Sequence, residues 1–286
     1  MTNQAPSTYA SEMAQSIIKR TLRLYRNGGL YQLGVHCAAK VARHSGIKAA
    51  KEWGHRAVFP VPEDFSSWTH PPDPLAIRYV NPARIDHCTC RGYPPYKGMG
   101  RRHGVVMKGD WDRCPPVSID PDYKARYERL YRDGDNRFNQ STFYRSLEAH
   151  FNRDVDWKDT GWYQISLEIM AAGGKASKSM TTKEELQERC RQIDTLFAEI
   201  KEKGYLSQQH LGNFPAATNE VKVDIGRDGT LLFANGRNRL AIAKIQCLPE
   251  IPVSVCVRHY EWMRYRDYAA QKIKVRKHPD LIDLPG

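Results

Sequence analysis

The sequence predicts an α+β protein in which a small mixed sheet is surrounded by helices. Val221–Ile225 alternates apolar with polar residues, as a half-buried strand does, and Ile251–Val257 is a second run of β-forming residues. The clearest helix opens with a capping box, Thr182-x-x-Glu185, and closes at Gly204. One apolar stripe runs along this helix, made of Leu186, Cys190, Ile193, Phe197 and Ile200.

Length and composition bound the class of protein. The chain has 286 residues, of which 41% are hydrophobic, enough for one or two domains with a core. No apolar run approaches the roughly 18 residues of a membrane-spanning helix, and the first residues lack the apolar core of a secretory signal. The seven cysteines show no disulfide framework, so we expect a cytoplasmic protein. A net charge of +12 favours a polyanionic partner.

Residues 1–56 are predicted to form a basic amphipathic helical extension, with helices from about Ser11 to Arg26 and from Leu30 to His44. Residues 1–60 contain nine Lys or Arg residues against Glu12 and Glu52, a net charge of +7 out of the total +12. Such helices fit nucleic acid or an anionic membrane surface, which would make the protein peripheral to the membrane. A solvated helical face is the alternative.

Residues 57–104 are predicted to be a Pro/Gly-rich linker or wrapping arm, with a short strand at Ala76–Val80. His87, Cys88 and Cys90 raise the question of a zinc site in this segment. Their spacing does not match the usual Cys-x₂-Cys pair, and no second pair follows, so we do not expect one.

Residues 105–275 are predicted to form the main domain, with a helical insertion at about 120–180 and a tail at 276–286. Its first strand ends at Asp110-Trp111-Asp112, and Asp228 lies in the turn of a later hairpin. These three aspartates are the candidate ligands for Mg²⁺. The same residues are common in turns that bind no metal, so both interpretations stay open.

The corner between Thr230–Ala234, the returning strand, and a helix at Arg237–Gln246 is the candidate binding site. Asn235 is a good N-cap, and Gly236 allows the backbone to approach a ligand closely. Free N–H groups, the positive helix end and the side chains of Arg237 and Arg239 together favour an anion, most naturally phosphate. Arginines in a first helical turn oppose the helix dipole, so a carboxylate that compensates them is the alternative explanation.

This corner also carries a resemblance to a known family. The span Arg189–His259 resembles the core of the ParB/sulfiredoxin-like domain, and Gly236-Arg237-Asn238-Arg239 is similar to its Gly-x-x-Arg box. The resemblance implies that the box holds nucleotide phosphates, as ParB proteins do with CTP, and sulfiredoxins and a related free-serine kinase with ATP. Most of residues 76–281 also resembles uncharacterised proteins with a ParB-like nuclease domain.

The chain departs from the family pattern in three places. Positions 237 and 238 hold Arg and Asn instead of the catalytic Cys of sulfiredoxins, which argues against sulfinic-acid reduction. Asn238 replaces the His or Arg of many ParB-like boxes. No helix-turn-helix is recognised after His259, so we expect no role in chromosome partitioning.

Three functions follow. The first is a nucleotide-binding protein, either a Mg²⁺-dependent NTPase or a phosphotransferase, that uses ATP or CTP. Its candidate bases are Asp194, Glu199 and His259, although each also suits a structural role on a helix surface or at a strand end. The second is a nucleic-acid-binding protein or nuclease, and the third is a non-catalytic peripheral binding module. The oligomeric state is left open by the sequence.

Overall fold

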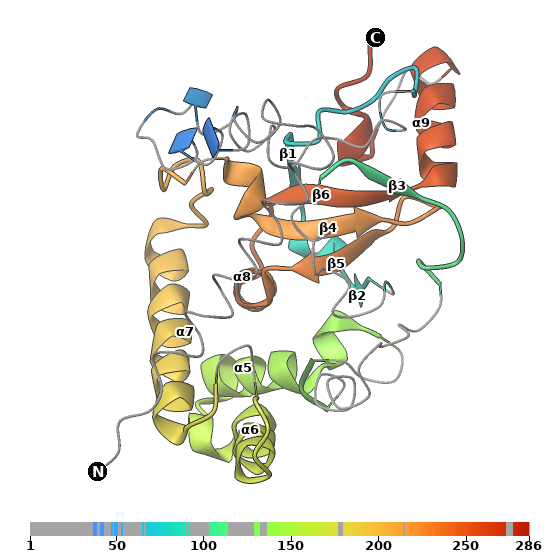
Figure 1. The fold of residues 1–286 in the computed structure, drawn as a ribbon. Coiled ribbons are helices and arrows are strands. Elements are labelled where there is room, and N and C mark those ends of the chain that lie inside the picture. Colours follow the sequence, from blue (N-terminus) through green and yellow to red (C-terminus); the bar gives the residue numbers. More distant parts are fainter. Residues whose placement is uncertain are drawn as a thin grey trace. The chain divides into compact units, whose positions relative to one another are not determined.

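The protein is described by a computed structural model (Figure 1), in which the chain divides into two compact units, Met1–Pro60 and Val61–Gly286. The structure describes residues 37–38, 41–42, 47, 49–50, 53, 65, 67–89, 91, 103–113, 129–131, 136–176, 180–213, 215–272 and 277–285. The basic helical extension predicted for residues 1–56 lies almost wholly outside these residues. The second unit is described below.

A mixed sheet of six strands forms the centre of this unit (Figure 1). Its strands are β1 (Ile77–Val80), β2 (His87–Cys88), β3 (Val105–Met107), β4 (Val221–Ile225), β5 (Leu231–Asn235) and β6 (Ile251–His259). The order is β1-β6-β4-β5-β2, and β3 also pairs with β6. Antiparallel pairs join β1 to β6 and β4 to β5, whereas β4 and β3 run parallel to β6 and β2 runs parallel to β5.

Strand β4 is buried at all five positions, including the polar Lys222 and Asp224. The alternation of apolar and polar residues predicted a strand with one solvated face, and this was wrong. Because β4 lies between β5 and β6, neither of its edges meets solvent. Its polar face is also covered, since Lys222 and Asp224 are both buried. The polar side chains on that face therefore need partners inside the protein.

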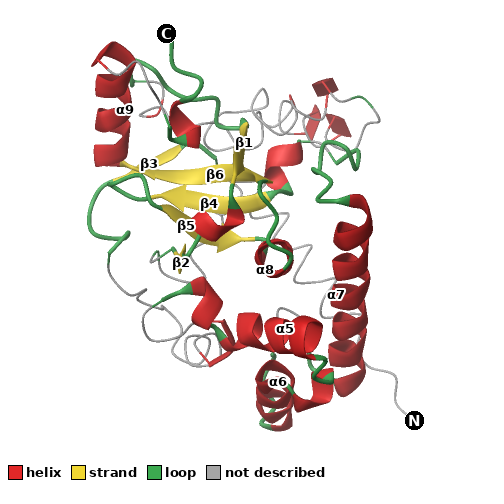
Figure 2. Ribbon diagram, turned by 180° about the vertical axis from the view of Figure 1, so that it is seen from behind, coloured by secondary structure: helices red, strands yellow, loops and turns green. Residues whose placement is uncertain are grey.

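The helices whose bounds are described are α5 (Thr142–Arg153), α6 (Gly161–Ala171), α7 (Lys183–Lys203), α8 (Arg237–Ile245) and α9 (Tyr260–Lys272). Figures 1 and 2 show α8 next to the sheet, with α5 and α7 farther out and α6 beyond α5. The central residues of α8, Leu240–Ala243, are completely buried, since the helix packs between the sheet and the outer helices. None of the described helices is long and apolar enough to cross a membrane.

Local sequence signals account for several of these boundaries. Thr182 and Glu185 form both hydrogen bonds of the predicted capping box at the start of α7, and Gly204 ends that helix. The expected strand before Asn81 and the helices near residues 141–151, 162–171 and 261–274 are also present, within a few residues. The mixed α/β class is therefore confirmed.

Segments outside residues 105–275 also belong to the fold. Both β1 and β2 lie within residues 57–104, so the segment predicted as a linker or arm supplies two strands of the sheet. At the other end of the chain, a 3₁₀ turn at Pro279–Leu281 packs against β1. The sheet therefore draws on a longer part of the chain than its predicted domain.

Candidate functional site at the start of helix α8

Gly236 makes the corner between β5 and α8. Its φ of 92° lies in the left-handed region, and a Cβ atom built on it would stand 3.0 Å from the Cα of Val221. Both features require glycine. Gly236 is the N-cap of α8 and, as a glycine, has no side chain to cap the first turn. The prediction of Asn235 as N-cap was wrong, because Asn235 is the last residue of β5 and its Oδ1 accepts the N–H of Gly236 at 2.7 Å.

Arg237 is held against aromatic rings. Its guanidinium carbon lies 3.9 Å from the centroid of the Tyr131 ring and 5.6 Å from that of Phe233. Contacts of this kind are attractive because the face of an aromatic ring is negative. They hold the charge of Arg237 in place in the first turn of α8.

Arg239 contacts the segment that leads into β4. Its Nη2 donates to the backbone carbonyl of Asn219, and its Nη1 lies 3.7 Å from Oε2 of Glu220. That distance allows an ion pair but is too long for a hydrogen bond. Glu220 is the kind of compensating carboxylate that the sequence left open as an alternative to an anion.

The carboxylate of Glu220 is fully buried. Its Oε1 accepts the N–H of Gln208 at 2.5 Å, whereas its Oε2 has no hydrogen-bond partner in the described part of the chain. Burial raises the pKa of Glu220, against the opposing effects of the Gln208 N–H, Arg239 and Tyr205. The Tyr205 hydroxyl and Nη1 of Arg239 are likewise buried without a hydrogen bond there.

The structure thus brings Tyr205, Glu220 and Arg239 together beneath the first turn of α8. Sequence reasoning missed Tyr205 and Glu220, because one follows a helix and the other precedes a strand, with no motif around either. Asn238 lies half-buried in the same turn. All five residues predicted to bind a cofactor, Asn235 to Arg239, are therefore at one corner of the fold.

The three candidate bases lie elsewhere and have other contacts. Asp194, on α7, accepts the indole N–H of Trp157 at 2.9 Å and lies 3.2 Å from Nε2 of His150. Glu199 is exposed on the same helix. His259 is buried, accepts the N–H of Glu261 at 3.0 Å, and has its Nε2 2.8 Å from the carbonyl of Gly109. No hydrogen bond or ion pair found among the described residues joins these three to Asn235–Arg239.

The candidate metal ligands lie at or near the β4–β5 turn, but two of the three carboxylates are paired with an arginine of that turn. Arg227 donates to Asp112 at 2.7 Å and to Asp110 at 2.5 Å, and Asp228 accepts the N–H of Thr230. Burial alone raises the pKa of Asp112, but the hydrogen bonds and charge of Arg227 bring it below its usual value. Within the described ranges no three His, Cys, Asp or Glu side chains are grouped to hold a metal. These aspartates therefore do not fit a Mg²⁺ site.

Two of the three residues considered for a zinc site belong to the sheet. His87 and Cys88 form β2, and Cys88 is buried at the edge of the sheet. Cys90 lies outside the described residues. The positions that are described therefore serve as sheet residues.

The buried polar face of β4 carries a second group that the sequence did not reveal. Arg91 donates to both oxygens of Asp224, at 2.7 and 2.9 Å, and Asp224 also accepts the N–H of Val257. On neighbouring β6, Ser254 Oγ lies 3.4 Å from Nε2 of His103. This group is buried and explains why β4 tolerates polar residues in the core.

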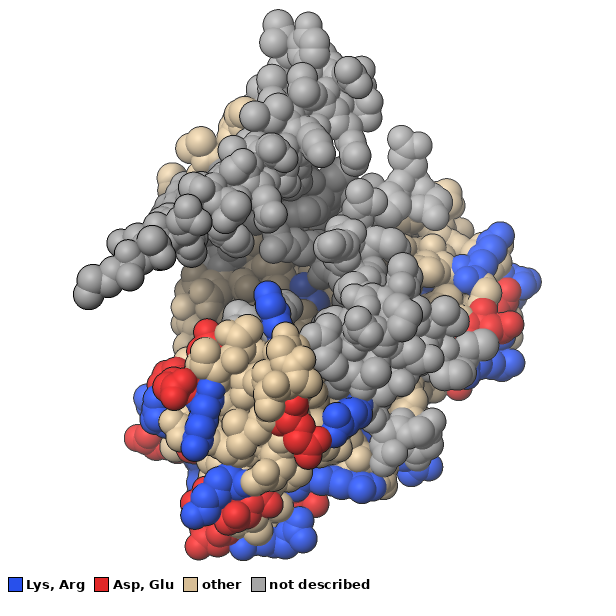
Figure 3. All heavy atoms as spheres, turned by 60° about the horizontal axis from the view of Figure 1, so that its bottom comes forward, with Lys and Arg blue, Asp and Glu red and all other residues tan. Residues whose placement is uncertain are grey.

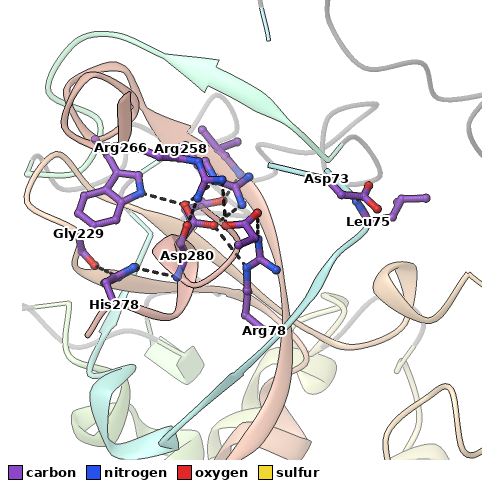
Figure 4. Close-up of polar contacts among 12 residues, drawn as sticks. Asp73, Leu75, Arg78, Gly229, Arg258, Arg266, His278 and Asp280 are labelled. Carbon is purple, nitrogen blue, oxygen red and sulfur yellow. Dashed lines mark hydrogen bonds and ion pairs between the residues drawn. The ribbon is translucent and has the colours of Figure 1, made fainter. Parts of the chain in front are cut away.

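A third group ties the C-terminal tail to the sheet (Figure 4). Asp280 accepts from Arg258 at 2.6 and 2.9 Å and from the indole of Trp262 at 2.9 Å, and its carbonyl accepts from Arg266. Burial by itself raises the pKa of Asp280, but the two arginines and the indole lower it to about 2. Arg78 of β1 adds a bond of 2.7 Å to Asp283.

Comparison with known proteins adds no relative. Searches of protein-family models, of curated proteins and of solved structures each found no significant match to the chain. The corner at Gly236 is therefore interpreted from its own geometry and from the resemblance of its sequence.

Proposed function

We propose that the protein binds the phosphate groups of a nucleotide at the start of α8, in the manner of ParB/sulfiredoxin-like domains. The observation that carries this proposal is the Gly236 corner. It has a positive φ, has no room for a side chain, and leads into a helix whose N-cap residue has no side chain to cap the first turn. The positive end of the helix dipole at such a turn suits a phosphate oxygen.

Arg237 and Arg239 would contribute to phosphate binding in different ways. Arg237 is already ordered by its contacts with Tyr131 and Phe233, so little further side-chain entropy is lost when an anion binds. Arg239 is about one-fifth exposed and can turn a guanidinium edge toward a ligand. ATP and CTP are the candidate ligands, because the resemblance implies a nucleoside triphosphate.

Calorimetry with each of the four common nucleoside triphosphates, with and without Mg²⁺, tests the proposal. The wild type is expected to bind at least one of them. Arg239→Ala should weaken binding by roughly ten- to a hundredfold, the usual value of a hydrogen bond to a charged group. Arg191→Ala is the matched control, since Arg191 is an exposed arginine on α7 paired with Glu188. No heat with any nucleotide, or an equal loss in the control, would overturn the proposal.

Turnover is tested on the same samples. A phosphotransferase or NTPase is the reaction class that the resemblance implies, and release of phosphate or of the nucleoside diphosphate measures it. At nucleotide concentrations below saturation, Arg239→Ala should lower any turnover by about the same factor as it weakens binding. Turnover that this substitution leaves unchanged would place the chemistry away from α8.

Binding to nucleic acid or to a membrane surface is the second candidate function, and the charge of residues 1–60 is what favours it. The described surface shown in Figure 3 does not add to it, because its Lys and Arg residues alternate with Asp and Glu. Two examples are the ion pair of Arg129 with Glu168 of α6 and that of Arg191 with Glu188, both on α7. Affinity of the full chain for DNA that falls steeply with salt, without nucleotide binding, would favour this candidate.

A further inference from the structure

Glu220 stands directly behind the cation of the proposed phosphate site. Its carboxylate is fully buried at the entrance to β4, and Arg239 lies over it with the Nη1–Oε2 distance of 3.7 Å. The two groups attract each other, but their Nη1 and Oε2 atoms are too far apart for a hydrogen bond, and the Tyr205 hydroxyl is a further described group that acts on both. The pair is therefore an incomplete one.

Few groups are able to compensate the charge of Glu220. The described groups that face it are the N–H of Gln208, the hydroxyl of Tyr205 and the guanidinium of Arg239. Burial raises the pKa of Tyr205, so its hydroxyl stays neutral across the ordinary pH range. His210, in the same segment, contacts Ser207 through Nδ1 at 2.9 Å and is not among the groups acting on Glu220. The ionised form of Glu220 is therefore favoured first by the N–H of Gln208 and then by Arg239 and Tyr205, and of these three groups only Arg239 carries a charge.

A phosphate at the start of α8 changes this balance. Its negative charge draws the guanidinium of Arg239 toward the ligand and also repels the carboxylate behind it. A buried carboxylate that loses its cation is stabilised by taking up a proton, since burial penalises the charged form.

We propose that the bound phosphate and Glu220 compete for Arg239, so that anion binding at α8 is coupled to proton uptake by Glu220. This inference rests on the proposed phosphate site and specifies how that site is regulated. The proton comes from solvent and goes to Oε2, where the Tyr205 hydroxyl can accept a hydrogen bond from the neutral carboxyl. No other bond is made or broken.

The coupling has a definite sign. Because the bound state holds one more proton than the free state, affinity for the anion rises as pH falls. The slope approaches about tenfold per pH unit over the range in which Glu220 is ionised in the free protein and neutral in the complex. At higher pH the ionised Glu220 opposes the ligand.

Inorganic sulfate is the probe, because it does not titrate near neutral pH. Calorimetry in two buffers of different ionisation enthalpy, over a series of pH values, measures the protons taken up per anion bound. In the wild type we expect uptake that approaches one proton per site. Glu220→Gln should abolish the uptake, flatten the pH dependence and bind sulfate at least as tightly as the wild type above neutral pH.

Two further variants separate this role from a merely structural one. Tyr205→Phe removes the acceptor for the neutral carboxyl and should reduce the uptake, while Glu202→Gln, which changes an exposed carboxyl on α7, should leave it unchanged. The wild-type measurement, together with an infrared band of a protonated carboxyl that appears on binding, needs no variant to fold. Sulfate binding without proton uptake, or uptake that persists in Glu220→Gln, overturns the inference alone. No binding of sulfate or of any nucleotide overturns the proposed site as well.

Discussion

Among the buried arginine–carboxylate pairs of the described residues, Arg258–Asp280 and Arg239–Glu220 differ in how completely they are formed. Arg258 grips Asp280 with two hydrogen bonds of 2.6 and 2.9 Å, whereas Arg239 approaches Glu220 only to 3.7 Å. The pKa of Asp280 is lowered to about 2, whereas burial leaves the pKa of Glu220 raised. The closed pair holds the C-terminal segment against the sheet, and under the proposed function the open pair leaves Arg239 able to bind a ligand.

The largest expected effect comes from breaking the closed pair. Asp280→Asn should lower the free energy of unfolding by about 3–5 kcal/mol, because it leaves Arg258 buried without its counter-charge. Urea denaturation measures the change. Asp159→Asn, an exposed aspartate, is the control and should alter stability by less than about 0.5 kcal/mol. A loss for Asp280→Asn as small as that of the control would contradict a fastening role.

Gly236→Ala should have the next largest effect and concerns the backbone of the open region. It should cost about 2–3 kcal/mol, because alanine is strained at a φ of 92° and its Cβ would press on the backbone of Val221. Gly173→Ala is the matched control, with a φ of 76° but no atom within 4 Å of the added Cβ. It should cost only about 1 kcal/mol. Equal losses in thermal or urea unfolding would show that the close approach to Val221 is unimportant.

Acid should weaken the closed pair by an intermediate amount. A carboxyl whose pKa falls from 3.8 to about 2 on folding contributes stability above the higher value and loses it as pH drops toward the lower one. The loss is roughly 2 kcal/mol between about pH 4.5 and pH 2. Urea denaturation of wild type and Asp280→Asn should therefore give unfolding free energies that converge in this window. Curves that stay parallel would argue against the low pKa.

The smallest effect is expected at the open pair, and its pH dependence should have the opposite sign. Because the folded pKa of Glu220 is raised, its ionisation opposes folding, and stability falls as pH rises above the usual value of 4.5. Glu220→Gln should therefore change stability by less than about 1 kcal/mol at neutral pH. Relative to wild type, this variant should gain stability as pH increases. A loss as large as that of Asp280→Asn would mean that the two pairs are equivalent.

Local signals in the sequence were sufficient for much of the fold. The capping box of Thr182 and Glu185, the apolar stripe of α7 and the glycine at 236 are each written in a few neighbouring residues, and the structure contains all three. The mixed class followed from the same kind of pattern. The corner that holds Asn235–Arg239 was predicted for the same reason.

The remaining features depend on partners distant in the sequence. Asp224 is buried because Arg91 reaches it from another segment, and Asp112 contacts Arg227 instead of joining a metal site. Glu220 becomes a candidate site residue only because the fold places Arg239 of α8 next to it. No spacing or periodicity marks such pairs, since the contact is created by the packing of the sheet and its helices.

The arrangement along strand β6 has a consequence for how the protein is made. One edge of β6 pairs with β1 over Ile251–Ser254 and with β3 over Val257–His259, and its other edge pairs with β4. All three neighbours are synthesised before β6. Until β6 is made, β1 and β3 lack the strand edge with which they pair, so the contact order of the sheet is high. We therefore expect the nascent chain to expose these strand edges, and chaperones that shield them to raise the yield of folded protein.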